Sequence, residues 1–131
     1  MARILHNGEY QEVIIDDYFP VKQDSNRAAF AQPAGGQEIW VLVLEKCWAK
    51  LYGSYANIIG GLPSEVLHAL SSAPAFYNRI PSDPNRQEEL WQRMLRDEKN
   101  GALLACGTKG DPEVENFGFV KGHAYTIVHL C

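Results

Sequence analysis

The sequence predicts a fold of the α+β class, in which helices and short antiparallel strands follow one another along 131 residues. Two observations lead to this prediction. Large apolar residues recur at helical spacing in the segment 38–55 and again after Pro84, whereas the β-rich segments near both ends of the chain are short and bounded by Gly or Pro. With 46% hydrophobic residues, the composition is that of a globular domain, which excludes bulk disorder.

The first strand is predicted at residues 10–17, where β-branched residues lead into a polar end. Pro20 closes this strand, because proline cannot donate a hydrogen bond to a ladder. A turn is expected over 22–26, and a short returning strand over 27–31.

The longest apolar segment, 38–55, is predicted to form a helix. Its large side chains recur at intervals of three and four residues, which places them on one helical face; they are Trp40, Leu44, Trp48, Leu51 and Tyr55. Three further apolar residues at 41–43 widen this face, so we expect the helix to be buried on most sides. Cys47, in its middle, is expected to be a small buried hydrophobe.

The double glycine at 60–61 and Pro63 break the chain, which predicts a boundary between two subdomains. A short helix is expected over 64–70, followed by an irregular stretch over 71–81.

The last third of the chain predicts one more helix and two strands. Asp83 is expected to cap a helix that begins with Pro84, and the Asn-Gly pair at 100–101 to end it. A strand over 102–108 and a last strand within 117–130 follow, separated by a polar loop.

Composition and charge exclude several classes of protein. Twelve Lys and Arg residues against 16 Asp and Glu give a net charge of −4 without a basic cluster, so no nucleic-acid partner is expected. No apolar run approaches the roughly 20 residues of a membrane span, and the first residues do not resemble a secretory signal. Three widely spaced cysteines argue against a disulfide framework and fit a reducing, cytoplasmic location.

His123 follows Gly122 in an apolar strand, and the residues alone leave two readings open. It is either a core histidine that hydrogen-bonds the backbone, or a general base held by the strand, with Gly122 admitting a ligand backbone. A shared zinc with His129 is not supported, because six extended residues place the two side chains about 20 Å apart.

A general base of this kind would activate a cysteine thiol, since the thiolate is the attacking form. None of the three cysteines is a convincing nucleophile. Cys47 is expected inside a helix and Cys106 inside a strand, and Cys131 is the last residue of the sequence. A nucleophile is better placed at a helix N-terminus, where the helix dipole lowers the pKa of a thiol.

Five segments together resemble the protease core of the calpain family of cysteine proteases. Residues 12–20 resemble a strand that ends in D-D-x-L-P, and 38–55 is similar to E-x-W-x-x-x-L-E-K-A-x-A-K-x-x-G-S-Y. The glycines at 60–61 match a double glycine of the family. Residues 101–106 resemble G-S-L-L-x-C, and 120–126 match V-K-G-H-A-Y-S. The helix and the G-H-A-Y strand together are specific to this family.

The resemblance implies part of a papain-like core with two subdomains. Residues 1–61 would finish the helical first subdomain, and residues 62–131 would begin the second, built on an antiparallel sheet. The implied activity is intracellular endoproteolysis of protein or peptide substrates, through acyl transfer to a thiolate.

The resemblance also implies roles for four residues. His123 corresponds to the catalytic histidine, and Gly61 and Gly122 to glycines whose backbone groups hydrogen-bond an extended substrate; turn geometry alone is the alternative for both glycines. Glu38 corresponds to a calcium ligand of the calcium-dependent members. The alternative for Glu38 is a solvated residue in the first turn of a helix, because calcium needs six to eight oxygen ligands. No cofactor is required by these residues themselves; calcium would belong to the complete core.

The sequence departs from the family pattern in three places. The nucleophilic Cys of a Q-x-x-x-G-D-C-W segment and the orienting Asn of an N-P-W-G segment have no counterpart, so we expect these 131 residues alone to be inactive. Ser-Ser-Ala at 71–73 stands where the family often has T-G-G. The competing hypothesis is a calpain-like module without catalytic activity that serves binding or scaffolding, and an accidental resemblance is the third. An unpaired edge on the strand within 117–130 would also allow self-association.

Overall fold

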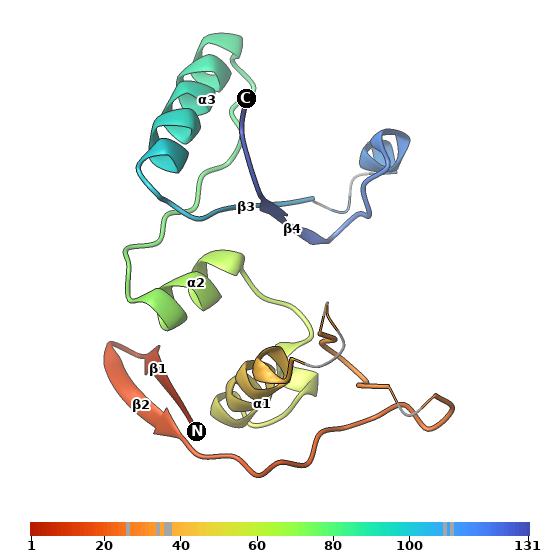
Figure 1. Cartoon of the computed structure of the whole chain (residues 1–131). Helices are drawn as coiled ribbons and strands as arrows, with labels where there is room; N and C mark the ends of the chain where they lie inside the picture. Colours follow the sequence, from red (N-terminus) through yellow and green to blue (C-terminus); the bar gives the residue numbers. More distant parts are fainter. Residues whose placement is uncertain (26, 34, 36–37, 109, 111) are drawn as a thin grey trace. The chain divides into compact units, whose positions relative to one another are not determined.

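The computed structural model describes residues 1–25, 27–33, 35, 38–108, 110 and 112–131. Three α-helices, two short 3₁₀ helices and two small antiparallel sheets make up this part of the chain, as Figure 1 shows. The α+β class predicted from the sequence is therefore confirmed. The chain divides into two compact units, Met1–Gly61 and Leu62–Cys131, and each is described by itself.

The first unit begins with a hairpin of two antiparallel strands, β1 (Ala2–His6) and β2 (Glu9–Val13). Asn7 and Gly8 form its two-residue turn with positive φ angles of 53° and 82°, the combination that suits the twist of a hairpin. Strand β1 was not among the predicted elements, although the Asn-Gly pair is a recognised hairpin signal. The predicted strand over 10–17 was too long, because pairing ends at Val13.

Helix α1 (Trp40–Leu51) packs against both strands of the hairpin. It is shorter than the predicted 38–55: its end is marked by Gly53, whose φ of +92° does not continue a helix, and a separate 3₁₀ helix, η1 (Ala56–Ile58), follows. The expectation that this helix is buried on most sides was wrong. Only Cys47 and Ala49 are buried in it, and its other residues are partly or largely exposed.

Among the described residues of the first unit, the core consists of four small or medium side chains, Ile4, Val13, Cys47 and Ala49. Cys47 is fully buried, and its thiol donates to the carbonyl oxygen of Val13 at 3.8 Å. Its predicted role as a small buried hydrophobe is confirmed.

Between β2 and α1, the described residues form no helix or strand. The returning strand predicted over 27–31 was wrong: it is reduced to one isolated antiparallel bridge between Val21 and Ala28. The backbone N–H of Ala31 donates instead to both carboxylate oxygens of Glu45 on α1, at 3.1 Å each. The Glu45 carboxylate thus takes the place of the backbone carbonyl that a neighbouring strand would supply. The turn predicted over 22–26 includes Asn26, which lies outside the described residues.

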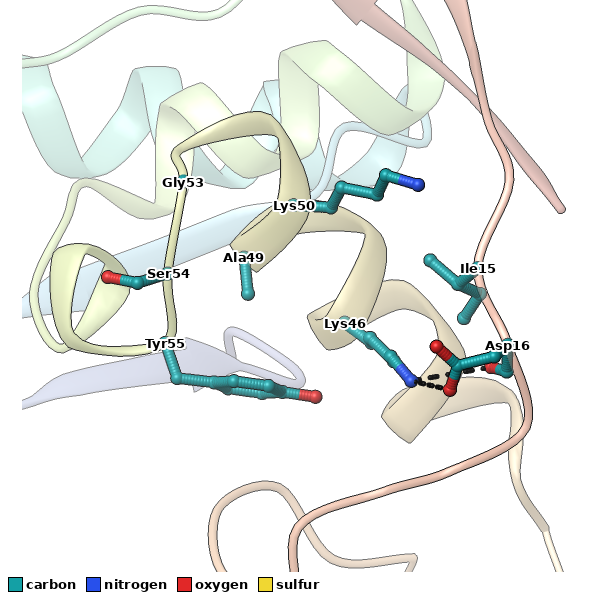
Figure 2. Close-up of a pocket in the computed structure, with 8 residues that line it drawn as sticks. All are labelled: Ile15, Asp16, Lys46, Ala49, Lys50, Gly53, Ser54 and Tyr55. Atoms are coloured by element: carbon teal, nitrogen blue, oxygen red, sulfur yellow. Dashed lines mark hydrogen bonds and ion pairs between the residues drawn. The ribbon is translucent and has the colours of Figure 1, made fainter.

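Two lysines of α1 hold the extended segment that follows the hairpin (Figure 2). Lys50 donates to the carbonyl oxygen of Ile14 at 2.6 Å, while Lys46 contacts the Asp16 carboxylate and the carbonyl oxygen of Tyr18. The hydrogen bond from Lys46, followed by that from the Tyr18 N–H, lowers the pKa of Asp16 below its ordinary value of 3.8.

Because the pKa of Asp16 is lowered in the folded state, the stability that the ionised carboxylate contributes is present above pH 3.8 and is lost as the pH falls through the lowered value. Lys46→Met is expected to return the pKa of Asp16 toward 3.8, measured by NMR titration of the carboxyl carbon. Lys50→Met is the matched control, since Lys50 contacts Ile14 instead of Asp16. An unchanged Asp16 titration in Lys46→Met would contradict this assignment.

The second unit begins with α2 (Pro63–Ser71), close to the predicted 64–70. Ser72 ends the helix in the left-handed conformation, with a φ of +60°, and its N–H donates to the carbonyl oxygen of His68 at 2.8 Å. Residues 72–81 contain no helix or strand, as predicted for the stretch 71–81.

Helix α3 (Pro84–Lys99) begins and ends where its sequence signals predict. The Asp83 carboxylate accepts hydrogen bonds from the N–H groups of Asn85 and Arg86, at 2.8 and 3.2 Å. At the other end, Gly101 takes a φ of +86° and its N–H donates to the Glu98 carbonyl oxygen. Local signals suffice here because both ends are fixed by residues adjacent in the sequence.

Asp83→Ala is expected to lower the free energy of unfolding by about 1 kcal/mol, because the two N–H groups of the first helical turn lose their acceptor. The measurement is urea denaturation of the 131-residue chain, followed by circular dichroism. Asp83→Asn keeps a capping oxygen and should remain within a few tenths of a kcal/mol of the parent. Equal losses in both variants would show that the cap does not stabilise α3.

The second sheet pairs β3 (Leu104–Gly107) with β4 (Ala124–Ile127) in antiparallel register. Strand β3 is shorter than the predicted 102–108, and β4 lies within 117–130, the segment predicted to contain the last strand. Between them, the chain forms the 3₁₀ helix η2 (Pro112–Phe117) where a polar loop was expected. The last strand is confined to four residues because Gly118 and Gly122, both with positive φ, turn the chain before Ala124.

Candidate active site

His123 immediately precedes β4, and its side chain is exposed. Its carbonyl oxygen accepts from the Thr108 N–H at 2.9 Å, and its own N–H donates to Thr108 Oγ1 at 3.0 Å. The backbone of His123 is therefore tied to the end of β3, while the imidazole lies at the surface. The reading of His123 as a core histidine was wrong.

The imidazole of His123 packs edge-on against the ring of Tyr125, with centroids 5.0 Å apart and planes at 81°. The Tyr125 ring in turn meets Phe119 at 5.3 Å and 78°. Residues two apart on a strand share a face, so this aromatic contact lies on the face of β4 that carries His123. The site thus combines an exposed base with a backbone fixed from the neighbouring strand.

Gly122 precedes His123 in the turn, with a φ of +66°, and no atom lies within 4 Å of the position that a Cβ would occupy. Within the chain itself, glycine is favoured here by the backbone conformation, because no neighbouring atom would meet a side chain. Gly61, at the end of the first unit, also has open space around its Cβ position. Gly122 and His123 are consecutive residues and therefore lie together in the structure. A role for Gly61 or Gly122 in substrate binding stays a prediction.

Glu38 is exposed and lies before α1, whose first turn contains no acidic residue, so its reading as a first-turn helix residue was wrong. Its carboxylate lies 3.6 Å from the Cβ position of Gly35. Within the described parts of the chain, no group of three or more His, Cys, Asp or Glu side chains could hold a metal ion. The role of Glu38 as a calcium ligand stays a prediction.

All three cysteines are free thiols. Cys47 is buried in the middle of α1, and Cys106 is exposed in β3, directly opposite Tyr125. Cys131 is exposed and follows β4. None of them begins a helix, which is the position that favours a thiolate.

The pocket drawn in Figure 2 belongs to the first unit and is a feature separate from the predicted site. Lys46 and Asp16 point toward one another across it, and Tyr55 lies along its wall. Burial, followed by the charge of Glu45, raises the pKa of the Tyr55 hydroxyl. The lining includes none of the predicted site residues.

Thr108 was not among the residues predicted from the sequence, and Tyr125 was noted only as part of the family motif. A threonine at the end of a strand carries no signal of its own, because its partners are 12 and 15 residues away along the chain. Tyr125 could have been found from its position two residues after His123, on the same face of the strand.

The amino-acid sequence of the chain matches a family of known proteins. The whole chain, residues 1–131, matches the family described as calpain family cysteine protease. The calpain-type cysteine protease DEK1 of Zea mays is 33% identical over 136 residues, covering 98% of this chain and 6% of the relative. Calpain clp-1 of Caenorhabditis elegans is 34% identical, covering 92% of the chain and 15% of the relative. The calpain-1 catalytic subunit of Macaca fascicularis is 33% identical, covering 92% and 17%.

The chain therefore belongs to the calpain family of cysteine proteases, which confirms the resemblance found in the sequence. It spans between 6% and 17% of the length of these three relatives. In the part of the chain that the structure describes, no helix is long and apolar enough to cross a membrane.

Proposed function

We propose that this chain supplies the general base, His123, of a calpain-type cysteine endopeptidase. The observation that carries the proposal is the exposed imidazole on a backbone anchored to β3, at the position of the catalytic histidine in the family motif. A general base must be accessible to the thiol and held in a fixed geometry.

In the proposed mechanism, His123 takes the proton of a cysteine thiol, and the thiolate attacks the carbonyl carbon of the scissile peptide bond. The protonated imidazole then gives its proton to the leaving amine, which leaves an acyl-enzyme that water hydrolyses. The substrate is a protein or peptide in extended form. The open space around Gly61 and Gly122 supports their proposed role, because a substrate backbone can approach where no side chain stands.

We propose that the nucleophile and the orienting Asn are supplied by segments outside these 131 residues. The buried position of Cys47 and the absence of a helix N-terminus at Cys106 and Cys131 support this proposal. The free state of all three thiols supports a reducing, cytoplasmic compartment. Calcium dependence would then arise from ligands that join Glu38 in the complete core.

The test is hydrolysis of a fluorogenic peptide, measured with the 131-residue chain and with a longer protein that includes it, each before and after treatment with iodoacetamide. We expect no turnover by the 131 residues alone and alkylation-sensitive turnover by the longer protein. Turnover by the short chain that alkylation blocks would contradict the proposed source of the nucleophile. A folded but inactive longer protein would favour the binding or scaffolding alternative.

We also propose that the isolated chain self-associates. Within the described residues β4 pairs with β3 alone, which leaves its other edge open to a further strand. Sedimentation velocity should show a dimer whose fraction rises with protein concentration. A monomer throughout the accessible concentration range would contradict this expectation.

A further inference from the structure

Thr108 and Tyr125 together satisfy both backbone groups of Val120, the residue that opens the turn leading to His123. Thr108 Oγ1 donates to the carbonyl oxygen of Val120 at 2.5 Å, and the Val120 N–H donates to the phenol oxygen of Tyr125 at 2.9 Å. Thr108 immediately follows β3, and Tyr125 lies in β4. We call these two hydrogen bonds the Val120 clamp.

The Thr108 hydroxyl also reaches the other end of the turn. It accepts from the N–H of His123 at 3.0 Å. A hydroxyl has one proton and two lone pairs, so donation to Val120 and acceptance from His123 are compatible. The second possible acceptor of that proton, the His123 carbonyl oxygen, is farther away at 3.2 Å and is already bonded to the Thr108 N–H. One side chain therefore spans the turn from Val120 to His123.

The turn itself needs such support. Its third residue, Gly122, has a φ of +66°, and glycine is the residue that loses the most conformational freedom on folding. Without the Thr108 hydroxyl, the N–H of His123 and the carbonyl oxygen of Val120 would both lose a protein partner. Of its hydrogen bonds to the described residues, the backbone of His123 would then keep the one from the Thr108 N–H.

We infer that Thr108 is a positioning residue for the catalytic base: its hydroxyl, with the Val120 clamp, fixes the turn and thereby the orientation of the His123 imidazole. The edge-on contact between His123 and Tyr125 transmits the same constraint, because Tyr125 is both a clamp residue and the neighbour of the imidazole. The inference rests on the proposed function only in calling His123 the base. The structural constraint stands without it.

The first arm of the test uses NMR on the 131-residue chain. Thr108→Val removes the hydroxyl at nearly constant volume, and Thr108→Ser restores it. Loss of one hydrogen bond predicts amide hydrogen exchange at His123 that is faster by about fivefold to tenfold in the valine variant. The ring signals of His123 should shift, and contacts between the imidazole and the Tyr125 ring should weaken. The serine variant should restore both.

Thr126→Val is the matched control. Thr126 lies in β4 next to Tyr125, and adjacent residues of a strand point to opposite faces, so its side chain faces away from the Tyr125 ring. This substitution should leave the His123 signals unchanged. Unchanged His123 exchange and ring signals in a folded Thr108→Val chain would overturn the inference. Should valine unfold the sheet, Tyr125→Phe replaces it: it removes only the acceptor of the Val120 N–H, and the inference fails if the His123 signals then stay unchanged.

The second arm measures peptide hydrolysis by the longer protein. Thr108→Val should lower kcat by about tenfold to a hundredfold with little change in KM, since a misplaced base slows chemistry more than binding. Thr108→Ser should recover most of the loss. If His123→Ala leaves hydrolysis unchanged, the proposed function fails while the NMR arm still decides the inference. If His123→Ala is inactive and Thr108→Val retains full kcat, the inference fails and the proposed function stands.

Discussion

Replacing His123 by alanine is expected to lower kcat for peptide hydrolysis by about 10²–10⁴-fold in a protein that contains this chain and the rest of the protease core. The variant loses the group that takes the thiol proton and later returns it to the leaving amine. The imidazole is exposed and packs only edge-on against Tyr125, so its removal should leave the sheet intact. Steady-state kinetics on a fluorogenic peptide give the measurement.

The matched control for this substitution is His129→Ala. His129 is also an exposed histidine, six residues after His123. Its Nδ1 lies 2.7 Å from a carboxylate oxygen of Glu98 on α3, within hydrogen-bond distance. Activity within about twofold of the parent is expected for this variant. Equal losses in the two variants would show that the effect comes from a disturbed sheet, which would contradict the role of His123 as the base.

Ile4→Ala is expected to lower the free energy of unfolding by about 2–5 kcal/mol. Ile4 is fully buried, and among the described residues of the first unit three other hydrophobic side chains are buried, so little can close the cavity. Urea denaturation monitored by tryptophan fluorescence measures the change, because Trp48 lies on α1 in the same unit.

Ile14→Ala is the control for the core substitution, since it removes the same atoms from a side chain that is 66% exposed. Its effect should stay within about 0.5 kcal/mol. A loss at Ile4 no larger than that at Ile14 would contradict the assignment of the core to the contact between the hairpin and α1.

The elements that the sequence predicted best are those fixed by neighbouring residues. Asp83 caps α3, and the Asn-Gly pair at 100–101 ends it, because each signal acts within one turn of the helix. Helix α1 is different. Its apolar stripe predicted extensive burial, but only Cys47 and Ala49 are buried, and Trp40 remains 62% exposed. How much of a face is covered depends on its partners in space, which periodicity does not report.

The candidate site likewise combines a residue with a local sequence signal and a residue without one. The sequence singles out His123 because the residues around it, at 120–126, resemble a motif of the calpain family, to which the chain belongs. Its catalytic role stays a prediction. Thr108 could not be singled out, because its contribution arises only when β3 and β4 pair and bring it opposite His123. A residue whose function depends on strand register has no local signature in a single sequence.

The most direct test of the central claim, that His123 is the base of a cysteine peptidase, is the pH dependence of thiol alkylation in the longer protein. The rate of inactivation by iodoacetamide reports the thiolate fraction of the nucleophile. An ordinary thiol has a pKa of about 8.5, and pairing with an imidazole lowers it by several units. We predict rapid alkylation at pH 6 in the parent and a return to ordinary thiol behaviour in His123→Ala. An alkylation profile that is identical in the two proteins would contradict the claim.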